Sequence, residues 1–574
     1  MSTARSATYS PFSSNDGMNE TLLNVDTQFL YAADTVHQAF RQSAALHADR
    51  DFLCILPETA AKYQIEPRTY SYRDAASEVA KLEAQYRGAD LGHGHRVGLM
   101  LENRPAMFFH WLALNALGVS VVPINPEWRS TELEYLLAHS ELCIAVVPSA
   151  RALDVALAAR NAGCEVAVTS PDLSGLAHAP RPASFTAHAP DKNTECALLY
   201  TSGTTSRPKG CVLPNEYFLW AGTWYAKAGG LCQLTPGGER LITPLPMSHM
   251  NAMAVSTMAM LLTGGCIVPL DRFHPRSWWE SVRTARATII HYLGVMPAML
   301  LEAAPAPRDA DHHVRFGFGA GVSPRLHHEF ERRFAFPLLE AWAMTETGAG
   351  ASIIANHEPR KVGSTCFGRA PPGIEYRVVD ENKEDVAPGE PGELLIRRAG
   401  PEPRFGFFRE YFKDPEATAT AWQGGYFHTG DIVQVDAEGD FHFIDRRKNL
   451  IRRSGENISA TEVESVMLQH PGVANVGVSA VPDEVRGDEV LACIVPRAPV
   501  SVTQRDAFAR DVLDFCLQRL AYFKVPGFIV FCEALPLTPT EKIQRARLKE
   551  LAQGMLMGPT CVDLRALKKR PNTA

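Results

Sequence analysis

The sequence contains no C-x-x-C pair, and its twelve cysteines form no metal-like grouping with histidine. Disulfide frameworks and zinc sites reveal themselves through such spacings, so the sequence predicts neither. The first residues also lack a basic segment followed by an apolar one, which is the pattern of a secretory signal. Scattered cysteines of this kind are typical of proteins in a reducing compartment, and we therefore expect a cytoplasmic protein.

A basic surface is lacking as well, because 57 Lys and Arg residues are outnumbered by 64 Asp and Glu residues, for a net charge of −7. Proteins that bind nucleic acid usually carry a basic patch or stripe, so nucleic acid is not an expected partner. The segment "LRALKKR", residues 564–570, is the one basic stretch. We interpret it as a frayed, solvated tail without a function.

An uninterrupted membrane-spanning run is also missing. Residues 250–270 are long and apolar enough to suggest one, but Asn251, Ser256 and Thr257 interrupt them and a Gly-Gly pair splits them. We interpret this run as a buried helix, a glycine turn and a buried strand. An integral membrane protein is therefore not expected.

The chain does have enough residues for more than one domain, since 574 exceed what a single core usually holds. Helix-like and strand-like segments alternate along it. The strand "HRVGLML", the helix "PAMFFHWLALNALG" and the strand "VSVVPIN" follow one another over residues 95–125. A strand–helix–strand succession favours parallel pairing, so we predict an α/β fold whose large N-terminal domain has parallel or mixed sheets with helices.

Changes in this pattern divide the chain. Residues 1–30 are rich in Ser, Thr and Asn and are expected to be disordered. Residues 362–445 have short alternating strands with Pro, Gly and Asp turns, which predicts a small β subdomain. We place a boundary near Lys448, between a domain of residues 31–447 and a smaller α+β domain of residues 448–574.

The segment "YTSGTTSRPKG", residues 200–210, follows an apolar strand and combines glycine, hydroxyl and lysine side chains. Backbone N–H groups of a glycine-rich loop bind anions, Lys209 adds positive charge, and Pro208 stiffens the loop. It is not a G-x-x-x-x-G-K-[ST] loop, because its lysine precedes the glycine and no hydroxyl follows. A flexible surface loop stays open as the alternative. The expected anion-binding residues are Thr201, Ser202, Gly203, Thr204, Thr205 and Lys209.

This segment resembles the phosphate-binding signature of the adenylate-forming superfamily, which contains acyl-CoA synthetases, firefly-type luciferases and the adenylation domains of peptide synthetases. Ser206 stands where glycine is usual. The resemblance covers about residues 69–548 and is strongest to bacterial crotonobetaine/carnitine–CoA ligase-like acyl-CoA synthetases. Further family motifs follow in order: "PLPMSHMNAM", "FGFGAGVSP", "EAWAMTETG", "YFHTGD", "DRRKNLIRRSGENIS" and "TPTEKIQRARL".

The resemblance implies the nucleotide-binding residues. In addition to the loop, they are Gly319, Ala320, Gly321, Trp342, Thr345, Asp431 and Arg446. In the family, the Gly-Ala-Gly segment forms a wall for adenine and the threonine contacts phosphate. The positions of Asp431 and Arg446 bind the ribose hydroxyls. Glu346 and Thr205 are the implied ligands of Mg²⁺, a cation that often takes one or two carboxylates together with ATP phosphates.

The remaining implied residues concern catalysis and the acyl and CoA sides. Lys542 matches the catalytic lysine, which stabilises the charge that grows as a carboxylate attacks the α-phosphorus of ATP. Glu541 stands where glycine is usual. The other expected catalytic residues are His249, Lys209, Thr345 and Glu346. The expected acyl-pocket residues are His249, Met250, Asn251, Met253, Gly294 and Trp342. The expected CoA-side residues are Gly455, Glu456 and Asn457, and Lys448 is the expected hinge.

The implied activity is that of an ATP-dependent carboxylate–CoA ligase that uses ATP, Mg²⁺ and coenzyme A. An acid and ATP form acyl-AMP and pyrophosphate, and a thiol then displaces AMP while the mobile C-terminal domain changes its orientation. Three alternatives stay open: an acyl-AMP ligase that delivers to a carrier protein, a luciferase-like adenylating enzyme, and a catalytically silent nucleotide-binding regulator. The acid is not identified, and a homodimer stays open.

Overall fold

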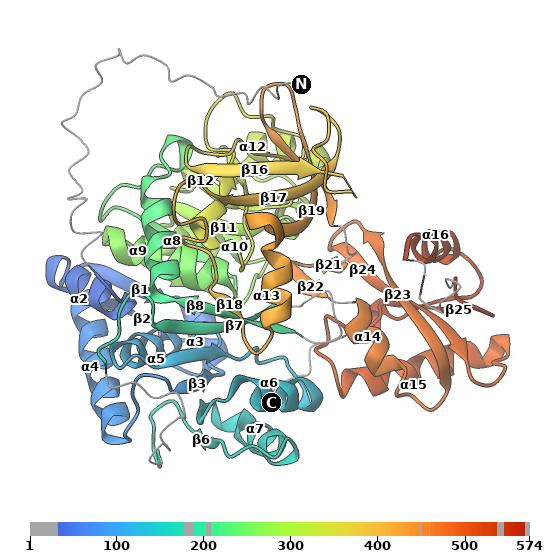
Figure 1. The fold of residues 1–574 in the computed structure, drawn as a ribbon, viewed down its shortest axis with the longest axis horizontal. Helices are drawn as coiled ribbons and strands as arrows, with labels where there is room; N and C mark the ends of the chain where they lie inside the picture. Colours follow the sequence, from blue (N-terminus) through green and yellow to red (C-terminus); the bar gives the residue numbers. More distant parts are fainter. Residues whose placement is uncertain are drawn as a thin grey trace, which may run out of the picture.

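Four β-sheets organise the part of the chain that the computed structural model describes (Figure 1). This part comprises residues 33–176, 188–201, 208–380, 382–446, 451–458, 460–536, 543 and 545–568. Three of the sheets belong to residues 33–446 and the fourth to residues 451–568. The predicted disordered segment 1–30 and the expected hinge Lys448 lie outside the described residues.

The seven-stranded sheet has the strand order β18-β8-β7-β4-β3-β5-β6, and its strands from β7 to β6 run parallel. Val97 of β3 lies opposite Val121 of β4, with α5 between these strands in the chain. The predicted strand–helix–strand succession is thereby confirmed. The strands are β3 (Arg96–Leu99), β4 (Ser120–Pro123), β5 (Ile144–Val146), β6 (Ala167–Thr169), β7 (Glu195–Thr201), β8 (Lys209–Pro214) and β18 (Glu410–Tyr411).

The eight-stranded sheet, in the order β14-β13-β12-β11-β9-β10-β1-β2, is parallel except at its two edge strands. Because parallel strands end at the same edge, β11, β12 and β13 bring three loops together there. The strands are β1 (Asp51–Ile55), β2 (Arg68–Ser71), β9 (Arg240–Thr243), β10 (Cys266–Pro269), β11 (Ile289–Leu293), β12 (Phe316–Ala320), β13 (Leu338–Trp342) and β14 (Ile353–Ile354).

Local sequence signals explain where the helices of this domain begin. Ser71 and Asp74 form a capping box at the start of α4, and Pro105 occupies the first turn of α5. The helices are α2 (Val36–Leu46), α3 (Pro57–Tyr63), α4 (Tyr72–Gly88), α5 (Pro105–Ala116), α6 (Ser130–Ser140), α7 (Ser149–Asn161), α8 (Asn215–Lys227), α9 (Thr257–Thr263), α10 (Trp278–Ala285), α11 (Val295–Leu301), α12 (Pro324–Phe334) and α13 (Pro415–Ala421).

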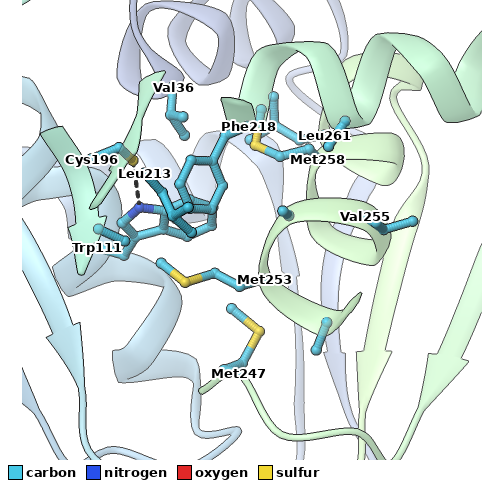
Figure 2. Packing of buried hydrophobic residues seen from close by; sticks show 14 of the residues in the cluster. Val36, Trp111, Cys196, Leu213, Phe218, Met247, Met253, Val255, Met258 and Leu261 are labelled. Atoms are coloured by element: carbon cyan, nitrogen blue, oxygen red, sulfur yellow. Dashed lines mark hydrogen bonds between the residues drawn. The ribbon is translucent and has the colours of Figure 1, made fainter. Parts of the chain in front are cut away.

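The interpretation of the apolar run 250–270 is confirmed. A π-helix, η2 (Asn251–Ser256), continues into α9, Gly264 ends that helix in the left-handed conformation, and β10 follows. Figure 2 shows Met258 and Leu261 from this run in the core, next to Phe218. In the part of the chain that is described, no helix has both the length and the hydropathy needed to cross a membrane.

An antiparallel five-stranded sheet follows in residues 366–446, in the order β15-β20-β19-β17-β16. In Figure 1, β16 and β17 lie in the upper part of the molecule, near β12 and α12. The strands are β15 (Cys366–Gly368), β16 (Ile374–Val379), β17 (Gly392–Arg398), β19 (Phe427–Val435) and β20 (Phe441–Arg446).

The C-terminal domain, orange to red in Figure 1, is built on the fourth sheet. Helices α14 (Ala460–Met467) and α15 (Arg505–Leu517) pack on one hydrophobic cluster of this sheet, and α16 (Arg545–Met555) packs on another. The strands are β21 (Ile451–Arg453), β22 (Glu456–Ile458), β23 (Val473–Asp483), β24 (Gly487–Pro496), β25 (Phe528–Phe531) and β26 (Cys561–Asp563). The predicted fold class is confirmed.

The expectation of a frayed, solvated tail is wrong for residues 564–568. Leu564 is buried, and Lys568 forms an ion pair with Glu489, which also pairs with Arg453. The segment is anchored because β26, immediately before it, pairs with β25. Burial lowers the pKa of Lys568 to about 7. The rest of the basic segment lies outside the described residues.

The two domains meet through a buried charge cluster. Lys524 of the C-terminal domain lies 2.7 Å from Glu132 of α6 and 2.8 Å from Glu462 of α14. All three side chains are at most 10% exposed. Trp128 lies beside the lysine, with its ring 5.7 Å from the ammonium. The charges of the two carboxylates outweigh burial and raise the pKa of Lys524, which stays protonated.

Candidate active site

A cleft of about 1230 Å³ is lined by residues of both domains. Its N-terminal walls come from the ends of β7, β11, β12 and β13, from the segment before β8, and from β18 and α13. The C-terminal domain contributes the β21–β22 hairpin and the segment before β25. Most sequence-predicted site residues that the structure describes are brought together in this cleft.

The predicted anion loop connects β7 to β8. Thr201 and Lys209 face each other across these strands, and both line the cleft. The Lys209 ammonium lies 3.4 Å from the Asp414 carboxylate and 4.7 Å from the centre of the Tyr411 ring. The loop itself, residues 202–207, lies outside the described residues. The described ends of the loop therefore place a cation at the cleft.

Thr345 and Glu346 follow β13 and also line the cleft. The Tyr217 hydroxyl donates a hydrogen bond to the Thr345 carbonyl at 2.9 Å, and the Tyr411 hydroxyl donates one to the Glu346 carboxylate at 3.1 Å. Burial raises the pKa of Tyr411 and the charge of Glu346 raises it further, so the phenol stays a donor. The first bond fixes the backbone at Thr345 and the second fixes the carboxylate of Glu346, for which the family resemblance implies a role in Mg²⁺ binding.

The Gly319–Gly321 segment lines the cleft at the end of β12, where no Cβ fits at Gly319. An added Cβ there would lie 2.3 Å from the Tyr292 carbonyl oxygen, whereas Gly321 has a φ of +81°. Glu340, from β13, accepts the Gly321 N–H at 2.8 Å and the Tyr292 hydroxyl at 2.7 Å. The buried carboxylate of Glu340 therefore fixes the backbone turn at Gly321 in the wall of the cleft.

Trp342 and Asp431 are brought into direct contact. The indole N–H of Trp342 donates to Oδ2 of Asp431 at 2.9 Å, and Asp431 is only 1% exposed. The backbone of Arg446 pairs with that of Asp431 across β20 and β19. Trp342 lines the cleft with a side chain whose nitrogen is already committed to this carboxylate. The aspartate is thereby oriented before any ligand binds.

The expected acyl-pocket residues are brought together with one exception. Met250, Asn251 and Gly294 line the cleft beside Trp224 and Phe318, two aromatic residues that the sequence did not single out. Met253 does not reach the cleft, because it points the other way into the core, where Figure 2 shows it near Trp111. The π-helical turn that starts at Asn251 holds more residues than a turn of an ordinary α-helix. This wider turn changes the direction in which the Met253 side chain points.

His249 and Glu456 meet across the domain boundary, with 3.6 Å between Nε2 and the carboxylate. Burial lowers the pKa of His249, but the hydrogen bond and the charge of Glu456 outweigh it, and the net result is a raised pKa. Gly455 has a φ of +85°, and a Cβ there would lie 2.0 Å from Leu293. A side chain at this position would push the hairpin out of the cleft.

Several predicted residues cannot be located. Those outside the described residues are Ser202, Gly203, Thr204, Thr205, Ser206, Lys448, Glu541 and Lys542. For Arg446 and Asn457 only the backbone is described.

Three residues that contribute to the cleft were missed by sequence reasoning: Glu340, Tyr411 and Lys524. For Lys524 a signal existed, since a lysine between an aromatic residue and "VP" in an otherwise apolar segment predicts a partnered charge. Glu340 is the first residue of the motif "EAWAMTETG", but no role was assigned to it. Nothing in the spacing of Tyr411 connects it to Glu346, because 65 residues separate the two.

Comparison with known proteins agrees with this geometry. The family model described as "AMP-binding enzyme" matches residues 40–412, and that of the "AMP-binding enzyme C-terminal domain" matches residues 462–542. The first match alone covers more than half of the chain. The chain therefore belongs to the AMP-binding enzyme family.

Two relatives narrow the class. The chain is 30% identical over 497 residues to the crotonobetaine/carnitine–CoA ligase of Salmonella agona (strain SL483), a match that covers 84% of this chain and 93% of the relative. It is 25% identical to o-succinylbenzoate–CoA synthetase of Bacillus subtilis. A double mutant of that enzyme bound to the product analogue OSB-NCoA gives a TM-score of 0.75 and covers 89% of this chain and 98% of that chain.

The same Bacillus subtilis enzyme with the acyl-adenylate intermediate OSB-AMP gives a TM-score of 0.61, with 89% and 97% of the two chains covered. The chain is thus more similar to the CoA-product complex than to the adenylate complex of one and the same protein. The predicted activity, AMP-forming ligation of a carboxylate to CoA, is confirmed by the family and these relatives.

Proposed function

We propose that this AMP-forming carboxylate–CoA ligase carries out both half-reactions in the cleft, with free CoA as the acceptor. The observation that carries the proposal is the shared lining of the cleft. Its N-terminal walls hold Lys209 and Glu346, and its C-terminal hairpin places Glu456 beside His249. A cation, two carboxylates and a histidine gathered in this way suit ATP on one side and a thiol on the other.

In the first half-reaction, the acid attacks the α-phosphorus of ATP and pyrophosphate leaves. Lys209 and the loop before it bind the phosphates, Thr345 contacts the α-phosphate, and Asp431 and Arg446 accept the ribose. Adenine lies against Gly319–Gly321. Glu346, with Thr205, fits Mg²⁺, because a cation that shares phosphate oxygens needs only one or two protein oxygen ligands. When bound, the metal neutralises phosphate charge.

Lys542 supplies the last positive charge for this step, and doing so requires another orientation of the C-terminal domain. Ile543, the next residue, packs with α16 against the C-terminal sheet. Among the described residues, none that lines the cleft comes from α16. We therefore infer a rotation about Lys448 at the boundary between residues 31–447 and 448–574. The higher TM-score to the CoA-product complex supports this reading.

In the second half-reaction, the thiol of CoA displaces AMP from the acyl-AMP. The β21–β22 hairpin borders the path of the thiol with Gly455, Glu456 and Asn457, and the absence of a side chain at Gly455 lets the hairpin approach Leu293 of the N-terminal wall. The Glu456 carboxylate influences whether His249 is neutral and accepts a hydrogen bond or is protonated and positively charged. His249 thereby orients the acid and the thiol where the two meet.

Three finer expectations accompany the proposal. Mg²⁺ is the metal of the ATP complex, the enzyme acts in the cytoplasm, and a homodimer is the oligomeric hypothesis to test by light scattering. The free cysteines support the second expectation, because unpaired thiols are typical of a reducing compartment.

The deciding experiment is a panel of carboxylic acids incubated with ATP and CoA in the absence of oxygen, followed by measurement of AMP and acyl-CoA. Both products are expected from at least one acid. Acyl-AMP that accumulates despite CoA would favour delivery to a carrier protein, and a requirement for oxygen would favour a luciferase-like enzyme. If no acid yields AMP or acyl-CoA, the remaining hypothesis is a nucleotide-binding regulator.

A further inference from the structure

The wall of the cleft around Asn251 is held by a buried hydrogen-bond network. His291, on β11, lies with Nδ1 2.9 Å from Oδ1 of Asn251 and 2.8 Å from the Ser256 hydroxyl. Its Nε2 lies 3.1 Å from the Tyr225 hydroxyl. The Ser256 hydroxyl donates to the Asn251 carbonyl oxygen at 3.0 Å. His291, Tyr225 and Ser256 are fully buried, so every hydrogen in this network needs an acceptor.

That requirement fixes the positions of the hydrogens. Tyr225 has His291 Nε2 as its acceptor, so its hydroxyl donates and Nε2 accepts. Burial lowers the pKa of His291 to about 3, so the ring is neutral and its single hydrogen resides on Nδ1. Nδ1 therefore donates to Oδ1 of Asn251. The opposite tautomer would leave the buried Tyr225 hydroxyl without an acceptor in the described part of the chain, which is costly.

The orientation of the Asn251 amide follows from this. Its oxygen is turned toward His291, so its Nδ2 points elsewhere, and it makes no hydrogen bond within the residues that the structure describes. Asn251 also lines the cleft. The amide thus presents two N–H hydrogens, and no acceptor, to whatever binds beside it.

The surroundings of this donor are neutral. Phe318 stacks on His291 with 4.8 Å between ring centres, and Trp224 meets Phe318 edge to face at 6.3 Å. Among the described residues of η2, α8, β11, β12 and β13, none that lines the cleft carries a carboxylate. The two aromatic faces attract a cation as well as a flat apolar group, but a cation has no carboxylate to pair with on this wall and is repelled by the N–H hydrogens of Asn251.

We propose that the acid activated by this enzyme has an uncharged, largely apolar acyl group that presents a hydrogen-bond acceptor to Nδ2 of Asn251, and that His291 is the positioning residue for this contact. The acceptor is a carbonyl, ether, hydroxyl or ring-nitrogen atom. The inference rests on the proposed function, since it takes this wall of the cleft as the acyl site. It sets the chain apart from its relative named for carnitine, a quaternary ammonium acid.

The test compares matched acids by the rate of AMP release with CoA present. Benzoate and its three pyridine analogues, above the pKa of the ring nitrogen, differ by one acceptor atom, and carnitine supplies the cationic comparison. The best pyridine acid is expected to exceed benzoate in kcat/KM by about three- to tenfold, the range of one hydrogen bond between neutral groups. Carnitine is expected to be the poorest acid.

Variants then assign the preference to a residue. Asn251→Leu is expected to bring the pyridine-to-benzoate ratio to about 1 or below, because the donor to the acceptor atom is lost. The acceptor of the His291 Nδ1–H is lost with it, so the rates with both acids are expected to fall. Met250→Leu, a change of shape without a change of polarity at the neighbouring position, is expected to alter both rates and keep the wild-type ratio. His291→Gln is expected to lower the ratio, since the amide is no longer held.

The outcomes separate this inference from the proposed function. A wild-type ratio at or below 1 for all three pyridine acids, or a preference for carnitine, overturns the inference even if the Asn251 variant does not fold. An unchanged ratio in Asn251→Leu overturns the assignment to this residue. If no acid releases AMP, the proposed function itself is wrong.

Discussion

The two domains build the cleft in different ways. Residues 33–446 supply walls in which backbone meets backbone: a Cβ at Gly294 would lie 1.7 Å from the Gly321 carbonyl oxygen. Residues 451–568 supply charges instead, with Lys524 reaching Glu132 and Glu456 reaching His249. Apart from Trp128, each hydrophobic core cluster of the described chain consists of residues from one domain only.

This difference shows which part of the site can move. Walls held by close packing cannot separate without opening cavities, which costs several kcal/mol for each large side chain (about 2–5). Ion pairs can exchange their partner for water at a much lower net cost when the interface opens. The C-terminal domain can therefore change its orientation while both cores stay intact, and the N-terminal walls keep their shape.

The largest expected effect comes from Lys542, the proposed catalytic charge of the C-terminal domain. Lys542→Ala is expected to slow acyl-AMP formation by about 100- to 1000-fold, because a positioned charge at the transition state is lost. Thioester formation from supplied acyl-AMP and CoA is expected to be unchanged. Pyrophosphate exchange and a single-turnover thioester assay measure the two steps. Arg547→Ala, exposed on α16, is the control, and normal exchange by the Lys542 variant would refute its assignment.

The next effect concerns the joint between the domains. Lys524→Met leaves Glu132 and Glu462 buried without their cation, a defect of about 3–5 kcal/mol that the domains relieve by separating. Thioester formation is expected to fall by about 10- to 100-fold, with adenylation retained. Half-reaction rates and small-angle scattering measure this. Lys524→Arg keeps the charge and is the matched control; equal losses in both half-reactions would argue against a joint.

A change confined to the fixed walls should affect the nucleotide alone. Asp431→Asn keeps an acceptor for Trp342 but removes the charge offered to the ribose hydroxyls, so KM for ATP is expected to rise by about tenfold. The thioester step should lose little. Asp385→Asn, on an exposed carboxylate of the same domain, provides the comparison. An unaltered KM for ATP would show that Asp431 does not bind the ribose.

The smallest effect is a shift in pH dependence at the domain boundary. Because Glu456 raises the pKa of His249, their ion pair stabilises this orientation at low pH and is lost as pH rises through that raised pKa. In Glu456→Gln that charge is absent, and the His249 pKa is expected to fall back toward its ordinary value of 6.5. Histidine NMR titration measures it; the pKa staying high would show that another group holds the charge.

The sequence predicted some residues of the cleft and missed or misplaced others. Lys209, Glu346 and Asp431 stand in short motifs, because the phosphate, metal and ribose that we propose they bind require particular polar groups in the same local backbone setting. Glu340 of β13 binds the Gly321 N–H and Tyr411 of β18 binds Glu346, and both contacts join separate strands, so the local sequence does not predict them. Met253 was misplaced because helical periodicity at η2 is broken by one wide turn, which moves its side chain into the core.

The sequence by itself determined the α/β succession, the order of the family motifs and hence the reaction class, since each depends on residues close together in the chain. Only the tertiary structure decided that Lys524 joins the domains, that Lys568 is buried, and that the amide oxygen of Asn251 lies against buried His291. The reason is physical: burial and hydrogen-bond direction depend on partners tens to hundreds of residues away, and periodicity does not encode them.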